Sequence, residues 1–234
     1  MNPLRAVAHW GGRQYMNSIC ASEAESQVFQ HHNERPVEYA FALGMLAAGR
    51  PRRVLDVGTG QAAWPSLLRH CGFLVTAIDN VRDYWPAGMT NRHWRVEDVD
   101  ITKPDGFRGQ FGAVTCISVI EHIEDHESAF RNMLTLSEPG GLGIVTTPYN
   151  DRLFDLDVYV RPDAAKGHSV PYKCRSSTAR EIEKWAAMGA TLERRDLWRM
   201  WSGPVWFTGE RIPWEPVASE NEPHQLGLFA FRKR

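Results

Sequence analysis

The chain has 234 residues, of which 43% are hydrophobic and 24% are charged, and this composition excludes a disordered chain and is typical of a globular one. Its formal net charge of -1 argues against nucleic acid as an obligatory partner, because phosphate binding needs a basic surface. Residues 1–10 hold no apolar signal core, and no apolar run is long enough to span a bilayer. We therefore expect a cytoplasmic protein, and its oligomeric state stays open.

The N-terminal part of the chain predicts helical structure ahead of the core. Residues 1–33 are weakly patterned, and we expect a loop with one or two short helices there. Residues 36–48 predict a clearer helix, because Pro36 suits a first helical turn and Gly49 suits a C-terminal stop. We assign residues 1–50 to an N-terminal helical segment of a single domain, 1–234.

The middle of the chain alternates short apolar runs with helical stretches. Strands are predicted at 53–57, 73–78, 93–96, 111–119 and 142–147, with helices at 62–71 and 127–136 and a turn at 139–141. Nearly continuous apolar strands that alternate with helices are typical of a parallel sheet covered on both faces. The sequence thus predicts an α/β fold in three layers.

The alternation breaks after Pro148. Residues 149–175 are long, polar and aromatic, and an insertion of this kind is usually a lid or a binding loop. A capping-box spacing at residues 178–181 then opens a predicted helix, and a strand is expected at 190–198. Residues 200–222, rich in Trp and Pro, are predicted to be a second loop, followed by a closing strand at 226–232.

A glycine turn follows the first predicted strand and indicates a ligand site. Gly58 and Gly60 allow positive φ and close approach of a ligand to the backbone. Asp79 ends the next strand, where a carboxylate can accept hydrogen bonds from ribose hydroxyls, and Asp98 ends the third. Ligands in such sheets bind beyond the carboxyl ends of the strands. These residues predict a site for a nucleoside-containing cofactor.

A dinucleotide is one alternative, because residues 58–63 also fit the pattern G-x-G-x-x-A. Asp56 weighs against it, since dinucleotide-binding strands are normally apolar at that position and a carboxylate is a poor neighbour for pyrophosphate. A carboxylate suits a cofactor that carries an amine and a sulfonium.

These motifs together resemble class I S-adenosylmethionine-dependent methyltransferases. The resemblance rests on residues 54–60 (Val-Leu-Asp-Val-Gly-Thr-Gly), Asp79, Asp98-Val99, 111–123 and 139–142. It implies a Rossmann-like fold with a seven-stranded, mostly parallel sheet whose last strand is antiparallel. It also implies S-adenosyl-L-methionine as the cofactor.

The resemblance assigns roles to residues around that cofactor. Asp56, Gly58 and Gly60 would lie against its methionine part, and Asp79 would bind the ribose. The remaining expected cofactor-binding residues are Asp98 and Val99 at the adenine, and Ile117 and Ser118 near the adenosine and the methionine amine.

The segment Ile-Glu-His-Ile at residues 120–123 resembles small-molecule O-methyltransferases of the quinone-biosynthesis type. Some relatives with the pattern Glu-x-x-Glu-His bind a divalent metal near the acceptor. Here Ser118 stands at the first position, and Glu121 with His122 would be an incomplete ligand set. We therefore expect no metal.

Two histidines are candidates for a general base, because an acceptor hydroxyl must lose a proton and imidazole titrates near neutral pH. His122 follows the fourth predicted strand, and His168 lies in the lid loop. The sequence predicts methyl transfer to a small-molecule acceptor, at a hydroxyl of a sugar, glycan or phenol, with nitrogen also open. The alternatives are a non-catalytic cofactor-binding scaffold of the same fold and a nicotinamide-dependent oxidoreductase.

Overall fold

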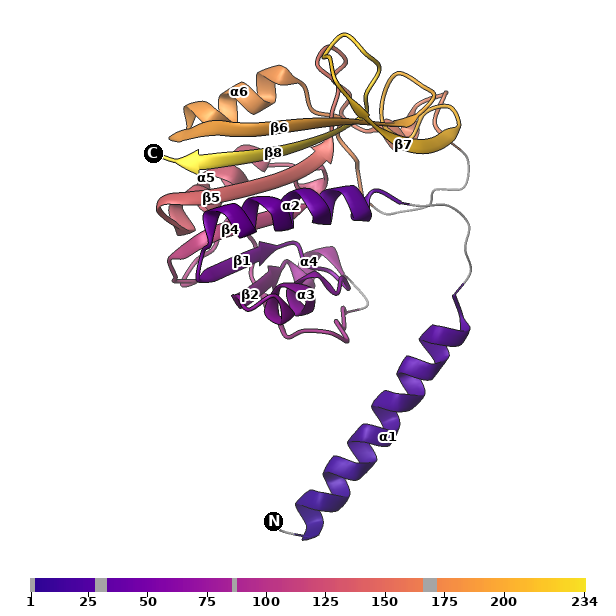
Figure 1. Ribbon diagram of the computed structural model, residues 1–234, viewed down its shortest axis with the longest axis vertical. Helices are drawn as coiled ribbons and strands as arrows, with labels where there is room; N and C mark the ends of the chain where they lie inside the picture. The colour runs from indigo at the N-terminus through magenta and orange to yellow at the C-terminus, as the bar shows by residue number, and fades with distance from the viewer. Residues whose placement is uncertain (1–2, 28–32, 86–87, 166–171) are drawn as a thin grey trace. The chain divides into compact units, whose positions relative to one another are not determined.

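The computed structural model describes residues 3–27, 33–85, 88–165 and 172–234 (Figure 1). The chain divides into two compact units, Met1–Asn33 and Glu34–Arg234. Helix α1 (Pro3–Glu25) occupies the first unit, so the predicted loop with short helices was wrong. Gly11 and Gly12 interrupt the apolar residues of this helix, and without a continuous apolar stripe the sequence carries little helical period.

The second unit is built on an eight-stranded sheet of order β3-β2-β1-β4-β5-β8-β6-β7 (Figure 1). Strands β1 to β5 pair in parallel, β8 is antiparallel to both β5 and β6, and β7 is antiparallel to β6. The strands are β1 (Arg53–Val57), β2 (Leu74–Asp79), β3 (Val96–Asp98), β4 (Phe111–Ile117), β5 (Ser137–Pro148), β6 (Ala190–Trp201), β7 (Arg211–Val217) and β8 (Leu226–Lys233).

This sheet confirms the α/β class, the mostly parallel order and the antiparallel closing strand β8. It has one strand more than the seven expected, because β7 lies inside the predicted loop 200–222. Strand β7 contains Pro213 and Pro216. Proline is tolerated at the edge of a sheet, where an N–H need not join the ladder. Prolines that favour a loop in the sequence therefore fit this edge strand.

Two predicted boundaries also moved. The short strand expected at 93–96 is β3, Val96–Asp98, whose position is set by its pairing with Ala77 to Asp79 of β2. The turn expected at 139–141 lies within β5, next to an irregular register between Phe111 and Ala113 of β4. Apolar pattern alone does not report such pairing.

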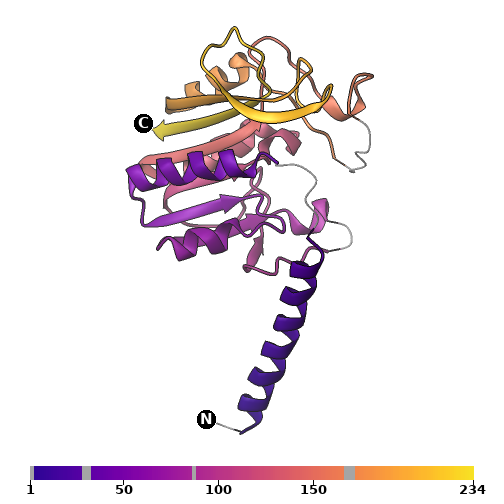
Figure 2. The ribbon, with the colours of Figure 1, turned by 45° about the vertical axis from the view of Figure 1, so that its right-hand side comes forward.

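Helices cover both faces of the sheet (Figures 1 and 2). Helices α2 (Arg35–Gly49) and α3 (Trp64–His70) pack on one face, and α5 (His126–Leu136) and α6 (Ala179–Ala187) pack on the other. Alternation along β1 sends Val54 to the first face and Leu55 to the second. The shorter helices are α4 (Val81–Tyr84), η1 (Ile120–His122) and η2 (Val158–Val160). Across the described ranges, we find no helix with the length and apolar character of a membrane span.

Candidate active site

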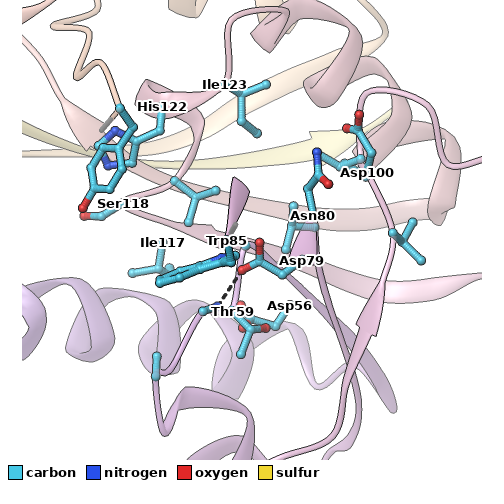
Figure 3. A pocket seen from close by; sticks show the side chains of 18 of the residues that line it. Asp56, Thr59, Asp79, Asn80, Trp85, Asp100, Ile117, Ser118, His122 and Ile123 are labelled. Carbon is cyan, nitrogen blue, oxygen red and sulfur yellow. Dashed lines mark hydrogen bonds between the residues drawn. The ribbon is translucent and has the colours of Figure 1, made fainter. Parts of the chain in front are cut away.

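A cavity of about 580 Å³ lies at the carboxyl ends of β1, β2, β3 and β4 (Figure 3). This is the edge at which parallel α/β sheets bind ligands. Each strand is followed by residues that line the cavity: Gly58 to Ala62 after β1, Asp79 and Asn80 at the end of β2, Val99 to Lys103 after β3, and Ser118 and Val119 after β4. The segments that follow four different strands therefore line the same cavity.

The glycine turn forms the floor of this cavity. Gly58 has φ +73°, and a Cβ there would lie 2.2 Å from Cγ1 of Val119. Gly60 has φ +52°, and a Cβ there would lie 3.5 Å from the Trp85 ring and 4.0 Å from Oδ2 of Asp79. Both glycines are thus favoured by their backbone conformation, and Gly58 is also required by close packing.

Asp79 joins the end of β2 to this turn. The backbone N–H of Gly60 donates to its Oδ2 at 2.7 Å, and the Trp85 ring lies beside the carboxylate (Figure 3). Burial raises the pKa of Asp79, while the Gly60 N–H and the Trp85 indole act in the opposite direction. The carboxylate reaches the cavity wall with one oxygen already held by the turn.

Asp56 is buried beneath the turn and lines the cavity. Its carboxylate accepts from the hydroxyls of Thr59 at 2.6 Å and Thr115 at 2.8 Å. Burial raises the pKa of Asp56 to about 7, against the lowering effect of those two hydroxyls. These contacts tie the turn to β1 and β4.

Asp98 and Val99 lie in different surroundings. The carboxylate of Asp98 accepts from the backbone N–H groups of Val81 and Arg82 at the start of α4 and pairs with the Arg82 side chain at 2.6 Å. Val99 and Asp100 line the cavity, whereas Asp98 is not among the lining residues.

Ile117 ends β4 and Ser118 follows it, and both line the cavity. Ser118 has φ +50°, which is uncommon for a residue with a side chain. Its N–H donates to Thr146, and its hydroxyl donates to Oε1 of Glu38 at 2.5 Å. The buried Glu38 therefore holds the strained residue in place.

Arg35 contributes a cation to the same wall. Its guanidinium pairs with Glu38 at 2.9 Å and donates to the carbonyl oxygen of Ile117 at 3.2 Å. Burial would lower the pKa of Arg35, but Glu38 and Glu34 raise it above its ordinary value. Helix α2 thus brings a permanently charged donor to the end of β4.

His122 lies in η1 and also lines the cavity. Its Nδ1 is 2.6 Å from the carbonyl oxygen of Lys173, and its ring makes an edge contact with Tyr172 at 4.5 Å between centroids. A carbonyl oxygen can only accept, so Nδ1 carries the proton and Nε2 is the basic nitrogen of the neutral ring. His168 lies outside the described residues.

The aromatic residues of the predicted loop 200–222, which was expected on the acceptor side, are not among those that line this cavity. Trp201 packs against Trp206 and Phe207, and Trp198 packs against Trp214. These rings belong to the core on the α2 side of the sheet. Within the described ranges, no group of three or more His, Cys, Asp or Glu side chains has a geometry suited to a metal ion.

Several residues of the site escape sequence reasoning. Arg35, Tyr39 and Trp85 line the cavity, yet none belongs to a spaced motif, whereas Tyr172 lies in the predicted lid. Asp100 offered a weak signal, because it follows Asp98 by two residues near the end of β3. The others reach the cavity only because the fold brings α2, the segment after α4 and the lid to one sheet edge.

Residues 29–203 match the family described as Methyltransferase domain. The chain belongs to this family. Among curated proteins, the ubiquinone biosynthesis O-methyltransferase of Coxiella burnetii (strain RSA 493 / Nine Mile phase I) is 28% identical over 97 residues, which is 38% of this chain and 41% of that protein. The corresponding protein of Xanthomonas campestris pv. campestris (strain B100) is 31% identical over 41% of this chain and 42% of its own. The chain thus spans about two fifths of the length of these relatives, 41% of the first and 42% of the second.

Solved methyltransferases share the fold. The 1,6-didemethyltoxoflavin-N1-methyltransferase of Burkholderia thailandensis, solved with S-adenosylhomocysteine, has a TM-score of 0.57 and 17% identity over 96% of this chain and 89% of its own. Magnesium protoporphyrin IX methyltransferase from Synechocystis PCC 6803 has a TM-score of 0.50 and 14% identity over 95% of each chain. At these identities the likeness concerns the fold alone.

Proposed function

We propose that this chain transfers a methyl group from S-adenosylmethionine to a hydroxyl of a small molecule. The observation that carries the proposal is the cavity in which the Gly58 to Gly60 turn meets the Asp79 carboxylate at the carboxyl edge of the sheet. Two further findings support it: the chain belongs to the methyltransferase domain family, and the curated relatives are named as O-methyltransferases.

The residues present fit this cofactor. Gly58 and Gly60 present backbone without side chains to the cavity, and Val119 fills the space that a Cβ at Gly58 would need. The Asp79 carboxylate suits the two hydroxyls of a ribose. A volume of about 580 Å³ lies within the range of small-molecule sites, roughly 300–1,000 Å³.

The charges of the cavity favour a sulfonium cofactor over a dinucleotide. Two cations, Arg35 and Lys103, line it together with the carboxyl groups of Asp56, Asp79, Asp100, Glu124 and Asp125. A pyrophosphate needs positive charge or a helix N-terminus free of carboxylates. An acidic wall instead suits a ligand with an amine and a positively charged sulfur.

In this proposal different residues of the cavity contact different parts of the cofactor. Gly58, Gly60 and Asp56 line the part of the cavity for the methionine moiety, where Ile117 and Ser118 present backbone at the end of β4. Asp79 binds the ribose, and Val99 with Asp100 flanks the adenine. For Asp98 we propose an indirect part, in which it holds α4 beside the adenine end. The guanidinium of Arg35 suits the carboxylate of the methionine moiety.

His122 is our proposed general base, and His168 remains a second candidate from the sequence. When bound, S-adenosylmethionine supplies an electrophilic methyl group on a sulfonium sulfur. His122 holds its Nδ1 proton against Lys173, so Nε2 is the nitrogen that can take the acceptor proton. Tyr172 packs on the ring and restrains its orientation. Phenolic and sugar hydroxyls are the acceptor classes we propose, with positioning supplying much of the rate.

Binding of S-adenosylhomocysteine tests the proposal directly. We expect calorimetric titration of the full chain to give one site, and thermal unfolding to shift upward with ligand concentration, because the ligand binds the folded state selectively. NADH should neither bind the site nor compete. Absence of S-adenosylhomocysteine binding at millimolar concentration would overturn the proposal. Turnover is then screened with phenols, sugars and amines as acceptors.

Asp79→Asn should weaken S-adenosylhomocysteine binding by about ten- to hundredfold. The substitution removes a hydrogen bond to a charged group, which contributes about 1.5–3 kcal/mol to binding. Asp105→Asn is the matched control, since Asp105 is exposed and outside the cavity. Equal affinities for the two variants, measured by calorimetry, would remove Asp79 from the site.

A further inference from the structure

Glu121 is a buried acid that the proposed function leaves unused. Its side chain is 3% exposed, and its Oε2 has no hydrogen-bond partner among the described residues. Burial raises the pKa of Glu121 to about 8, so the carboxyl keeps its proton at neutral pH unless a positive charge arises beside it. A buried carboxyl of this kind costs stability and calls for a physical explanation.

The neighbour of this carboxyl is the proposed base. Oε1 of Glu121 lies 3.9 Å from Nε2 of His122, and the two residues occupy successive positions in η1. Because Nδ1 donates a hydrogen bond to the carbonyl oxygen of Lys173, Nε2 is the nitrogen that can gain a proton and make the ring positively charged. The carboxyl therefore lies next to the nitrogen that would become positively charged.

Other charged and titratable groups surround this pair from three sides. From the α2 side come Arg35, Glu38 and Glu34, of which the two glutamates raise the pKa of Glu121 and Arg35 lowers it. From the lid and the segment after it, and from β4, the groups that interact with Glu121 are Tyr159, Tyr172, Cys174, Arg175 and Cys116. Arg35 is already paired with Glu38, whereas the Glu121 carboxyl lies 3.9 Å from Nε2 of His122.

We infer that Glu121 is a positioning residue for His122: when His122 takes the acceptor proton, the Glu121 carboxyl releases its own proton to water, and the resulting carboxylate offsets the positive charge of the ring. This inference rests on the proposed function. As the acceptor oxygen bonds to the methyl carbon, the carbon–sulfur bond breaks and its electron pair stays on sulfur. The hydroxyl proton passes to Nε2 of His122, and the imidazolium later returns it to water.

The benefit is electrostatic. Opposite charges about 4 Å apart attract far more strongly in a buried site than in water. A carboxyl that only fills space would be replaced by an amide with no effect on the ring.

Titration of the His122 ring tests the inference without an acceptor. The full chain, labelled with isotopic histidine and saturated with S-adenosylhomocysteine, is followed by NMR across pH, with His122→Asn to assign the signal. In Glu121→Gln we expect the midpoint of the His122 titration to fall by about one pH unit or more, because the amide keeps the shape but cannot ionise beside the charged ring. Glu121→Asp should restore part of the shift.

The control is Glu127→Gln, which removes an exposed carboxylate paired with Lys184 and should leave the His122 midpoint unchanged. A midpoint in Glu121→Gln within about 0.3 pH unit of the parent would overturn the inference. If that variant does not fold, carboxyl-labelled glutamate in the parent chain decides. A titration step shared by Glu121 and His122 supports the inference, and independent steps overturn it.

Failure of the proposed function gives a different result. In that case S-adenosylhomocysteine does not bind the parent chain, whatever the ring titration shows. If the ligand binds and the His122 midpoint is the same with and without the Glu121 carboxyl, the proposed cofactor is supported and the proposed role of Glu121 is wrong.

Discussion

Gly58 and Ser118 both line the cavity and both take left-handed backbone conformations. Gly58 does so without a side chain, and the space a Cβ would need is filled by Val119. Ser118 does so with a side chain, and Glu38 and Thr146 supply the hydrogen bonds that hold it there. The first conformation is readable from the sequence as glycine, whereas the second depends on residues 80 and 28 positions away.

Gly58→Ala should reduce affinity for S-adenosylhomocysteine more than tenfold and lower the free energy of unfolding by roughly 1–3 kcal/mol. The new Cβ would collide with Val119, which lines the cavity, and positive φ strains alanine. Calorimetric binding and urea denaturation measure the two effects.

The control for this variant is Gly72→Ala. Gly72 also has positive φ, at +98°, but nothing lies within 4 Å of its Cβ position. We expect a comparable backbone cost with unchanged affinity. Equal affinities for the Gly58 and Gly72 variants would show that close packing at the turn does not shape the site.

At the level of elements, local hydrogen bonds fix where helix α6 begins. Thr178 and Glu181 form a capping box, in which the carboxylate accepts from the Thr178 N–H at 2.9 Å. The spacing is visible in the sequence, and the predicted helix start is confirmed. Helix α6 then packs on the sheet through Ile182 and Trp185, which form part of the core beside α5.

Thr178→Ala should therefore lower the free energy of unfolding by about 1 kcal/mol, the usual cost of losing an N-cap side chain. Thr135→Ala is the matched control, because Thr135 lies on the exposed side of α5 and its hydroxyl donates back to the carbonyl oxygen of Arg131 in the same helix. Urea denaturation compares them. A control that loses as much as Thr178→Ala would mean that capping does not stabilise α6.

Across the whole molecule, buried carboxyl groups make the folded state favour protons. Burial raises the pKa of Asp56 from 3.8 to about 7 and that of Glu121 from 4.5 to about 8. For each, the stabilisation is complete below the unfolded value and is lost as pH rises through the folded value. Burial of His126 lowers its pKa from 6.5 to about 4, which has the opposite sign but acts below pH 6.5.

The ligand-free chain should therefore lose stability between about pH 6.5 and pH 8.5, by an amount on the order of 1–3 kcal/mol. Urea denaturation at both pH values measures the difference. In Glu121→Gln the loss should shrink, because the amide does not ionise, whereas the exposed Glu127→Gln should retain it. Stability that is constant or rises over this interval would contradict the assignment of these two carboxyls.

Local signals were sufficient for much of the fold and for part of the site. The apolar runs, the turn at Gly58 and Gly60, and the carboxylate of Asp79 follow from short-range chemistry, since strand ends and turns need particular residues whatever surrounds them. Helix α1 and strand β7 were missed because neither carries a periodic apolar pattern, and β7 is defined by its pairing with β6.

Tertiary structure decided the rest of the cavity. Asp98 has the position of a ligand-binding residue in the sequence, yet its oxygens bind the start of α4. Arg35 precedes the turn by more than twenty residues in the sequence and still lines the same wall. Sequence by itself determined the strand-turn-helix that builds the floor, because its hydrogen bonds and φ angles are local. Only the packing of α2, η1 and the lid could determine the walls, because contacts between distant segments leave no pattern in either segment alone.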